Sequence, residues 1–170
     1  MEPQILSGRN IEVRDEDGHR SLRARVDFNR GDTILEVRGD VVHVPSRYSI
    51  QVGTNEHVEP GLVPDDLNGY DDYLWPFLNH GFEPNSMMEG RQLLAIVDIA
   101  AGDEVTFNYN ANEWDMATPF KCMVTGRSVT GHKHLSPEQR ARIAPISASF
   151  ILELARQDVA VATPSMRVAE

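Results

Sequence analysis

The sequence predicts a mainly β domain with short helices, followed by a helical segment at its C-terminal end. In the first 110 residues, apolar and β-branched residues come in short runs between turn residues, which is typical of strands. A helix-start pattern follows at Ser136. The 170 residues, 41% of them hydrophobic and 25% charged, suit one globular domain. Short strands with few helices indicate an antiparallel, meandering fold.

The predicted strands follow one another with recognisable turns. An Asp-Glu-Asp-Gly turn at 15–18 separates the first two, and Arg-Gly-Asp at 30–32 leads into the third. The last two are expected to pair with each other across an Ala-Ala-Gly-Asp turn at 100–103. The predicted strands are 11–14, 22–26, 33–37, 41–44, 48–52, 92–97 and 104–108.

The C-terminal segment has the residues of a helix start. Ser136 can cap the helix, Pro137 suits the first helical position, and Gln139 can close a capping box. Pro145 should end or kink this helix. Beyond it, one helical face is apolar and is expected to pack on the domain, through Phe150, Ile151 and Leu154. We therefore expect a helical segment over 136–160 and a flexible tail over 161–170.

Charge and composition exclude several classes of function. A formal net charge of -10 argues against direct nucleic-acid binding and against binding to an anionic membrane. Cys122 is the single cysteine, so no internal disulfide can form. Residues 1–9 lack the basic and apolar regions of a signal peptide, and no apolar run approaches the roughly 20 residues of a membrane span. A cytoplasmic protein is the expectation.

Two short segments carry polar groups suited to chemistry. The first, 78–85, reads Leu-Asn-His-Gly-Phe-Glu-Pro-Asn, and the second, 101–110, reads Ala-Gly-Asp-Glu-Val-Thr-Phe-Asn-Tyr-Asn. Asn79 offers amide donors and a carbonyl acceptor, and His80 can be a base, a ligand or a structural residue. Tyr109 alone would be a strand aromatic whose hydroxyl needs a partner. Spacing alone identifies neither segment.

Taken together and in this order, the two segments resemble the signature motifs of the SET-domain methyltransferase family. The matching residues are Asn79, His80, Pro84 and Asn85 in the first motif, and Gly102, Glu104, Thr106, Phe107 and Tyr109 in the second. Residues 22–32 are similar to the family's opening strands and turn. The resemblance assigns residues 1–135 to a SET-like domain, of which about 112–135 are similar to a post-SET tail.

The resemblance implies a β-clip fold in which the two motif segments form a pseudoknot, and a site for S-adenosylmethionine. Tyr109 would be the catalytic residue, lying between cofactor and substrate. Asn79 would bind the amino-acid end of the cofactor and the backbone of His80 its adenine. The full implied cofactor site is Arg20, Ser21, Leu22, Asn79, His80, Tyr109 and Phe120. The implied walls of the substrate channel are Tyr73, Phe107 and Trp114, for which plain core packing is the alternative.

The chain departs from the family pattern in two regions. Where the family has Gly-x-Gly-Leu, this sequence reads His19-Arg20-Ser21-Leu22, and Gly18, one residue earlier, is a candidate to compensate. Where the family places zinc-binding cysteines, it has Phe82 and Val124. We therefore expect no zinc, and an apolar contact between Phe82 and Val124 in its place. A metal site joining Cys122 to His132 and His134 is the weaker alternative.

Three functions follow from these observations. The first is a methyltransferase that uses S-adenosylmethionine to modify a protein lysine. The second is an enzyme of the same fold that acts on a small molecule, with or without methyl transfer, because the altered glycines and tail would reshape the pocket. The third is a non-catalytic binding module, against which the retention of Asn79, His80 and Tyr109 argues. A monomer and a homodimer are both compatible with the sequence.

Overall fold

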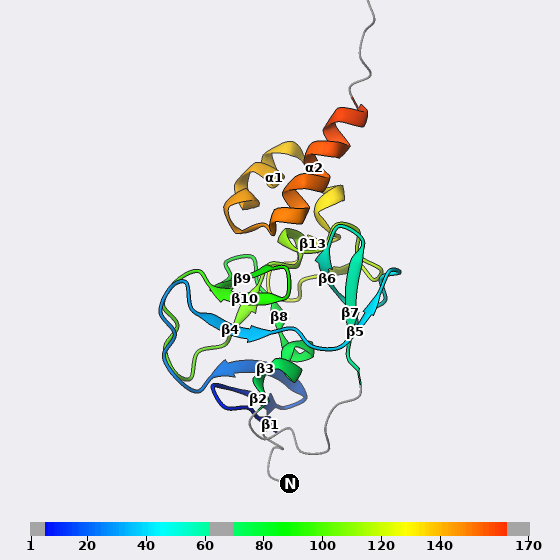
Figure 1. The fold of residues 1–170 in the computed structure, drawn as a ribbon. Coiled ribbons are helices and arrows are strands. Elements are labelled where there is room, and N and C mark those ends of the chain that lie inside the picture. Colours follow the sequence, from blue (N-terminus) through cyan, green and yellow to red (C-terminus); the bar gives the residue numbers. More distant parts are fainter. Residues whose placement is uncertain (1–5, 62–69, 163–170) are drawn as a thin grey trace, which may run out of the picture.

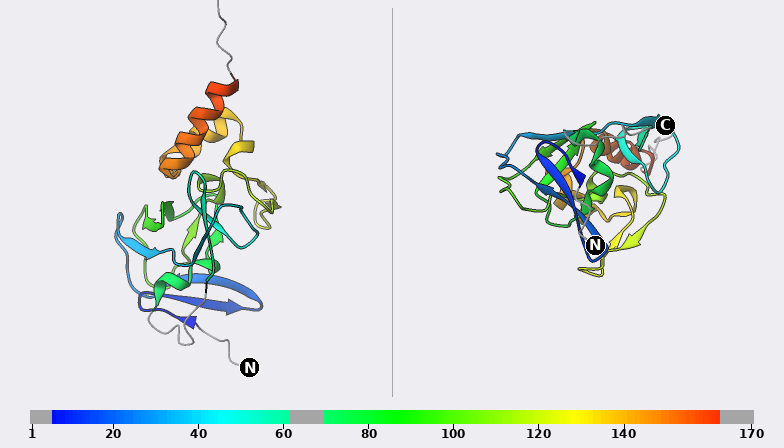
Figure 2. Two further views of the ribbon diagram at one scale, coloured as in Figure 1. Left: turned by 45° about the vertical axis from the view of Figure 1, so that its right-hand side comes forward. Right: turned by 90° about the horizontal axis from the view of Figure 1, so that it is seen from below.

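The chain folds into several small sheets, as a mainly β protein with short helices should. The computed structural model describes residues 6–61 and 70–162, so the expected tail lies largely outside the described residues. Two helices lie at one end of the molecule and the first sheet lies at the other (Figures 1 and 2). None of the helices in the described residues is long and apolar enough to cross a membrane.

The strands are β1 (Leu6–Ser7), β2 (Ile11–Glu16), β3 (His19–Ala24), β4 (Thr33–Glu36), β5 (Asp40–Val42), β6 (Ile50–Gly53), β7 (Glu56–Glu59), β8 (Asn79–His80), β9 (Ser86–Glu89), β10 (Gln92–Ala95), β11 (Thr106–Phe107), β12 (Phe120–Lys121) and β13 (Ser128–Val129). The helices are α1 (Pro137–Ile143) and α2 (Ser149–Ala162). Short 3-10 turns are η1 (Asp71–Tyr73), η2 (Trp75–Phe77), η3 (Tyr109–Ala111), η4 (His132–His134) and η5 (Ala144–Ile146).

The hairpin of β2 and β3 is the predicted one, with a tighter turn. The strands pair through Glu16 and His19, which leaves Asp17 and Gly18 as the two turn residues. Their φ angles of 55° and 83° are both in the left-handed region, as a two-residue hairpin of type I′ requires. Gly18 therefore serves the turn, and nothing lies within 4 Å of the position that a Cβ would take there.

The expected pairing of 92–97 with 104–108 is wrong. β10 instead pairs with β4 on one side and with β9 on the other, both antiparallel. β11 pairs with β8 in the parallel direction. Local turn residues favoured a simple hairpin, but the longer-range partner of β11 lies in the first motif, which sequence proximity cannot indicate. Two further sheets have the orders β5-β7-β6 and β12-β13.

The C-terminal helices form as predicted. The capping box is present, because Gln139 N–H donates to Ser136 Oγ and Ser136 N–H donates to Gln139 Oε1. η5 carries Pro145 and separates α1 from α2. Phe150 and Ile151 are buried with Ala148 in a second core cluster, against which Trp114 and Leu154 pack. α2 continues to Ala162, two residues beyond the expected end of the helical segment.

Candidate active site

The two motif segments meet at the centre of the molecule. β8 pairs with β11 through Asn79 opposite Thr106 and His80 opposite Phe107. The first segment then turns back, and Asn85 binds the same strand with its side chain. Asn85 Nδ2 donates to Glu104 O at 2.8 Å, and Asn85 Oδ1 accepts from Thr106 N at 3.0 Å. Main-chain and side-chain bonds from one motif therefore fix the strand that leads to Tyr109.

Tyr109 begins the turn η3 and is held at both of its ends. Its backbone N–H donates to His80 Nδ1 at 3.1 Å, and its hydroxyl donates to the carbonyl of Leu78. Burial raises the pKa of its phenol, and the negative charge of Glu113 adds to that rise. The phenol is therefore neutral, and its proton is engaged by Leu78, so the oxygen lone pairs remain able to accept.

His80 is neutral and has a defined tautomer. Because Nδ1 accepts the Tyr109 N–H, the ring proton lies on Nε2. Nε2 is buried and has no hydrogen-bond partner among the described residues. Burial lowers the pKa of His80 to about 4, with a smaller effect from the positive charge of Arg127. Its ring lies edge-on to Phe82 at 4.4 Å and to Phe120 at 6.1 Å between centroids.

The polar groups of the first motif fit the cofactor that the family resemblance implies. Asn79 Nδ2 donates to Arg20 O at 2.8 Å and to Glu104 Oε1 at 2.9 Å. Its Oδ1 accepts no hydrogen bond from the described residues, which leaves an acceptor beside a carboxylate for an ammonium group. Phe120, 38% exposed, offers a ring near His80 and Tyr109 on which a flat group can stack. Asn79, His80, Tyr109 and Phe120 are therefore brought together.

The three implied cofactor residues on β3 direct no free polar side chain toward Asn79. Ser21 and Leu22 have buried side chains, and Leu22 belongs to the main core. The exposed Arg20 side chain pairs with Asp15 at 3.3 Å, and its carbonyl is the group that touches Asn79. A role in cofactor binding for this strand would therefore come from its backbone, and it stays a prediction.

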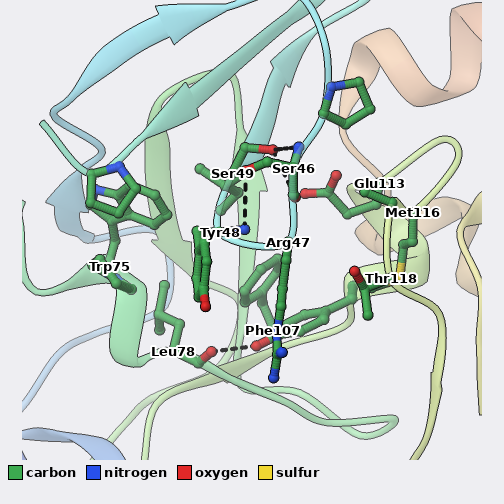
Figure 3. A pocket seen from close by; sticks show the side chains of 16 residues that line it. Ser46, Arg47, Tyr48, Ser49, Trp75, Leu78, Phe107, Glu113, Met116 and Thr118 are labelled. Atoms are coloured by element: carbon green, nitrogen blue, oxygen red, sulfur yellow. Dashed lines mark hydrogen bonds between the residues drawn. The ribbon is translucent and has the colours of Figure 1, made fainter.

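Beside this cluster lies a cavity of about 180 Å³ (Figure 3). Tyr109 and Phe107 form part of its wall, with their rings 4.7 Å apart. Figure 3 shows Trp75, Leu78 and Tyr48 on one side of the cavity and Met116, Thr118 and Glu113 on the other. Its lining residues are Pro45, Ser46, Arg47, Tyr48, Ser49, Ile50, Pro60, Trp75, Pro76, Leu78, Phe107, Tyr109, Glu113, Met116, Ala117 and Thr118.

Two of the three expected channel residues lie elsewhere. Phe107 lines the cavity, as expected. Tyr73 is in η1, edge-on to Tyr70 at 5.9 Å, and does not line it. Trp114 stacks on His132 at 6.0 Å and packs against the α2 cluster, so plain packing, the alternative reading, describes it. Its neighbour Glu113 lines the cavity instead.

Glu113 is the cavity residue that the motifs did not indicate. The residue is 9% exposed, and its Oε1 accepts from Gln51 N at 2.9 Å. Burial raises the pKa of Glu113 to about 7, against the lowering effect of its bonds from Gln51 and Asn112. A Glu four residues beyond a motif tyrosine is the one sequence signal that could have drawn attention to it. Tyr48 and Trp75 were also missed: Trp75 lies in an aromatic run of the kind common in cores, and Tyr48 is a single exposed aromatic residue without a motif around it.

The expected contact between Phe82 and Val124 is wrong. Val124 is 93% exposed, at the turn of the β12–β13 hairpin. The residue that meets Phe82 is Arg127, whose guanidinium lies 3.9 Å from the ring centroid. A cation–π contact therefore joins the tail to the motif loop, since Arg127 lies on the stem side of the turn and Val124 at its tip.

The residues of the weaker metal alternative are engaged elsewhere. His132 Nδ1 lies 3.1 Å from Asn110 O, and His134 Nε2 lies 2.7 Å from Asp115 Oδ1. Within residues 6–61 and 70–162, no group of three or more His, Cys, Asp or Glu side chains is placed to hold a metal ion.

Comparison with known proteins identifies a family and similar solved structures. The model of the SET domain family matches residues 19–110. Among solved structures, the chain is similar to one described as "crystal structure of KRYPTONITE in complex with mCHG DNA and SAH", with 20% identity and a TM-score of 0.49. That likeness covers 66% of this chain and 26% of the other, so this chain spans about a quarter of its neighbour's length. No protein of curated function matches this chain.

Proposed function

Because this chain belongs to the SET-domain family, we propose that it is an S-adenosylmethionine-dependent methyltransferase whose methyl acceptor is the side-chain amine of a protein lysine. The observation that carries the proposal is the position of Tyr109. On one side it contacts His80 and lies 6.0 Å from Phe120, and on the other it lines the aromatic cavity with Phe107. One residue thus belongs to both the candidate cofactor cluster and the candidate substrate cavity.

The residues of the first cluster would hold the cofactor by complementary polar groups. Asn79 Oδ1 and the neighbouring Glu104 carboxylate suit its ammonium group, and the ring of Phe120 suits its adenine. The buried Nε2–H of His80 is a donor that still lacks a partner among the described residues. When bound, S-adenosylmethionine supplies a methyl group on a positively charged sulfur, which is already a good electrophile.

The protein's own contribution is alignment and environment. Tyr109 is fixed at its amide by His80 and at its hydroxyl by Leu78, so its oxygen is held at one position in the cavity wall. Such fixed positioning of two reactants is a large part of catalysis when the electrophile is already activated. A fixed oxygen dipole can also favour the charge distribution of the transition state.

The cavity suits an alkyl amine. Its aromatic walls, which include Trp75 and Phe107, can pack against the methylene stem of a lysine. A lysine must lose its proton before it can attack. The apolar walls at the Leu78 and Tyr109 end of the cavity, away from the Glu113 carboxylate, would lower the pKa of its amine from the ordinary value of about 10.4. The net charge of -10 also favours approach of a basic protein.

Transfer of label from methyl-labelled S-adenosylmethionine tests this function. The purified chain should place label on the lysines of one or a few proteins of a cell lysate. Thermal unfolding, measured in parallel with cofactor at millimolar concentration, should move to higher temperature, because a ligand that binds only the folded state stabilises it. Label found on a small molecule and on no protein would contradict the proposed protein substrate, but it would agree with methyltransferase activity. No thermal shift and no labelled product would contradict the proposal entirely.

A further inference from the structure

We propose that Glu113 makes the cavity a binding site for a positively charged amine group of the substrate. This rests on the proposed function, because it names a chemical feature of the substrate of that site. Figure 3 shows Glu113 beside Ser46 and Met116, whereas Leu78, the acceptor of the Tyr109 hydroxyl, lies at the opposite end of the cavity. The bound charge would therefore lie apart from the hydroxyl of Tyr109.

The position of the carboxylate is fixed by the main chain around it. Glu113 N–H donates to Tyr109 O at 2.8 Å, and Glu113 O accepts from His132 N at 2.8 Å. At the end of the side chain, Oε1 accepts from Gln51 N at 2.9 Å and, in a longer contact of 3.4 Å, from Asn112 Nδ2. These bonds hold one carboxylate oxygen against β6, while Glu113 also lines the cavity.

The carboxylate has no positive partner in the part of the chain that the structure describes. It forms no ion pair there, and its Oε2 accepts no hydrogen bond, although a carboxylate offers about four lone-pair sites. Burying an unpaired charge is costly, and the raised pKa of Glu113 is the expression of that cost. A cation entering the cavity would offset it, which neither a neutral nor an anionic group would do.

The ionisable groups around Glu113 do not already serve this purpose. Tyr109 is a neutral phenol whose own pKa is raised partly by the charge of Glu113. Arg47 lines the cavity but is exposed, with its guanidinium 5.8 Å from the ring of Tyr48. His132 meets the carbonyl of Glu113 through its backbone, and its pKa is lowered by burial, so it too is neutral.

A purely structural role would not need the charge. The bond from Gln51 N–H requires an oxygen acceptor, which a glutamine amide would provide equally well. What a carboxylate adds is a negative charge in a space walled by Trp75 and Tyr48. A cavity of roughly 150 Å³ can hold benzene, so the 180 Å³ here is large enough for a short alkylammonium ion. Aromatic rings provide further attraction for such a cation.

Two probes of equal length, butylammonium and 1-butanol, test the proposal by nuclear magnetic resonance. The backbone amide of Gln51 donates to Glu113, so its signal reports the state of the carboxylate directly. Butylammonium should move this signal and lower the pH at which it titrates, whereas 1-butanol should leave that pH unchanged. Equal effects of the two probes, or a Gln51 signal that neither probe moves, would overturn the assignment.

Two variants separate the effect of the Glu113 charge from the effect of the net charge of the protein. Glu113→Gln should weaken butylammonium binding by roughly tenfold or more and leave 1-butanol binding unchanged, because an unpaired buried carboxylate is the stronger cation site. Glu153→Gln removes the same charge from the exposed face of α2 and should change neither. Unchanged butylammonium binding in Glu113→Gln would refute the inference. No methyl donor enters the measurement, so a chain that binds the amine but transfers no methyl would contradict only the proposed function.

Discussion

Replacing Glu113 by glutamine should change how the stability of the protein depends on pH. The folded protein holds the pKa of this carboxyl at about 7, mainly through burial, against an ordinary value of 4.5 for an exposed glutamate. Glutamine retains an oxygen that can accept the Gln51 N–H but has no proton to lose. The two proteins should therefore be similar in stability in acid and diverge as the pH rises.

The size of the divergence follows from the two pKa values. Between pH 4.5 and about 7 the folded state binds more protons at Glu113 than the unfolded state, so stability falls as the pH rises. At about 1.36 kcal/mol per pKa unit, the difference of roughly 2.5 corresponds to about 3 kcal/mol. The stabilisation is thus fully present below pH 4.5 and is lost as the pH rises through about 7.

His80 makes the comparison with a variant necessary. Burial lowers the pKa of His80 to about 4 from 6.5, so the unfolded state takes up its proton first as the pH falls. This group therefore costs stability between pH 6.5 and about 4, opposite to the trend of Glu113. The two trends nearly cancel in the wild type, and the difference between wild type and Glu113→Gln removes the contribution of His80.

Urea unfolding followed by tryptophan fluorescence at several values from about pH 4.5 to about pH 8 measures this difference. The free energy of unfolding of Glu113→Gln, minus that of the wild type, should increase by about 3 kcal/mol over that range. A difference that stays constant with pH would refute the reasoning, because Glu113 would then titrate alike in the folded and unfolded states. A circular-dichroism spectrum of both proteins checks that the fold is retained.

Three further variants test separate parts of the structure. Arg127→Ala should cost about 1 kcal/mol of stability, because it removes the cation over the ring of Phe82. It should also raise the pKa of His80, which a titration of the His80 ring protons can measure; an unchanged pKa would contradict the electrostatic effect of Arg127 on His80. Gly131→Ala should lower the free energy of unfolding by about 2 kcal/mol, because φ is 101° there and a Cβ would lie 2.7 Å from Trp114 O; equal denaturation midpoints would contradict this. Asn79→Ala should abolish most of the thermal stabilisation by S-adenosylmethionine. A thermal shift as large as that of the wild type would show that Asn79 does not belong to the cofactor site.

Part of the fold could be predicted from the sequence, because it depends on interactions between neighbouring residues. The Asp17-Gly18 turn and the Ser136 capping box each depend on neighbouring residues, and both predicted elements formed. The pairing of β11 depends instead on Asn79 and Asn85, which are distant in sequence. The nearby turn residues therefore predicted the wrong partner for β11. Long-range parallel pairing leaves no local signal.

The candidate site, too, could be predicted from the sequence only in part. Motif resemblance located Asn79 and Tyr109, because their residue types and order are specific. Glu113 was not found, since a glutamate after a turn gives no sign of burial until β6 brings Gln51 against it. The assignments of Trp114 and Val124 failed for a related reason, because the direction of a side chain in a loop depends on packing that the sequence does not express.

The central claim is that Tyr109 acts in methyl transfer at the point where the candidate cofactor cluster meets the candidate substrate cavity. Methyl transfer by Tyr109→Phe, measured beside its binding of S-adenosylmethionine, tests it most directly, with Tyr73→Phe as the matched control outside the cavity. We predict that Tyr109→Phe binds the cofactor as the wild type does and transfers methyl about 100-fold more slowly, because a positioned oxygen is lost. Tyr73→Phe should match the wild type in both. A Tyr109→Phe variant that is fully active would contradict the account.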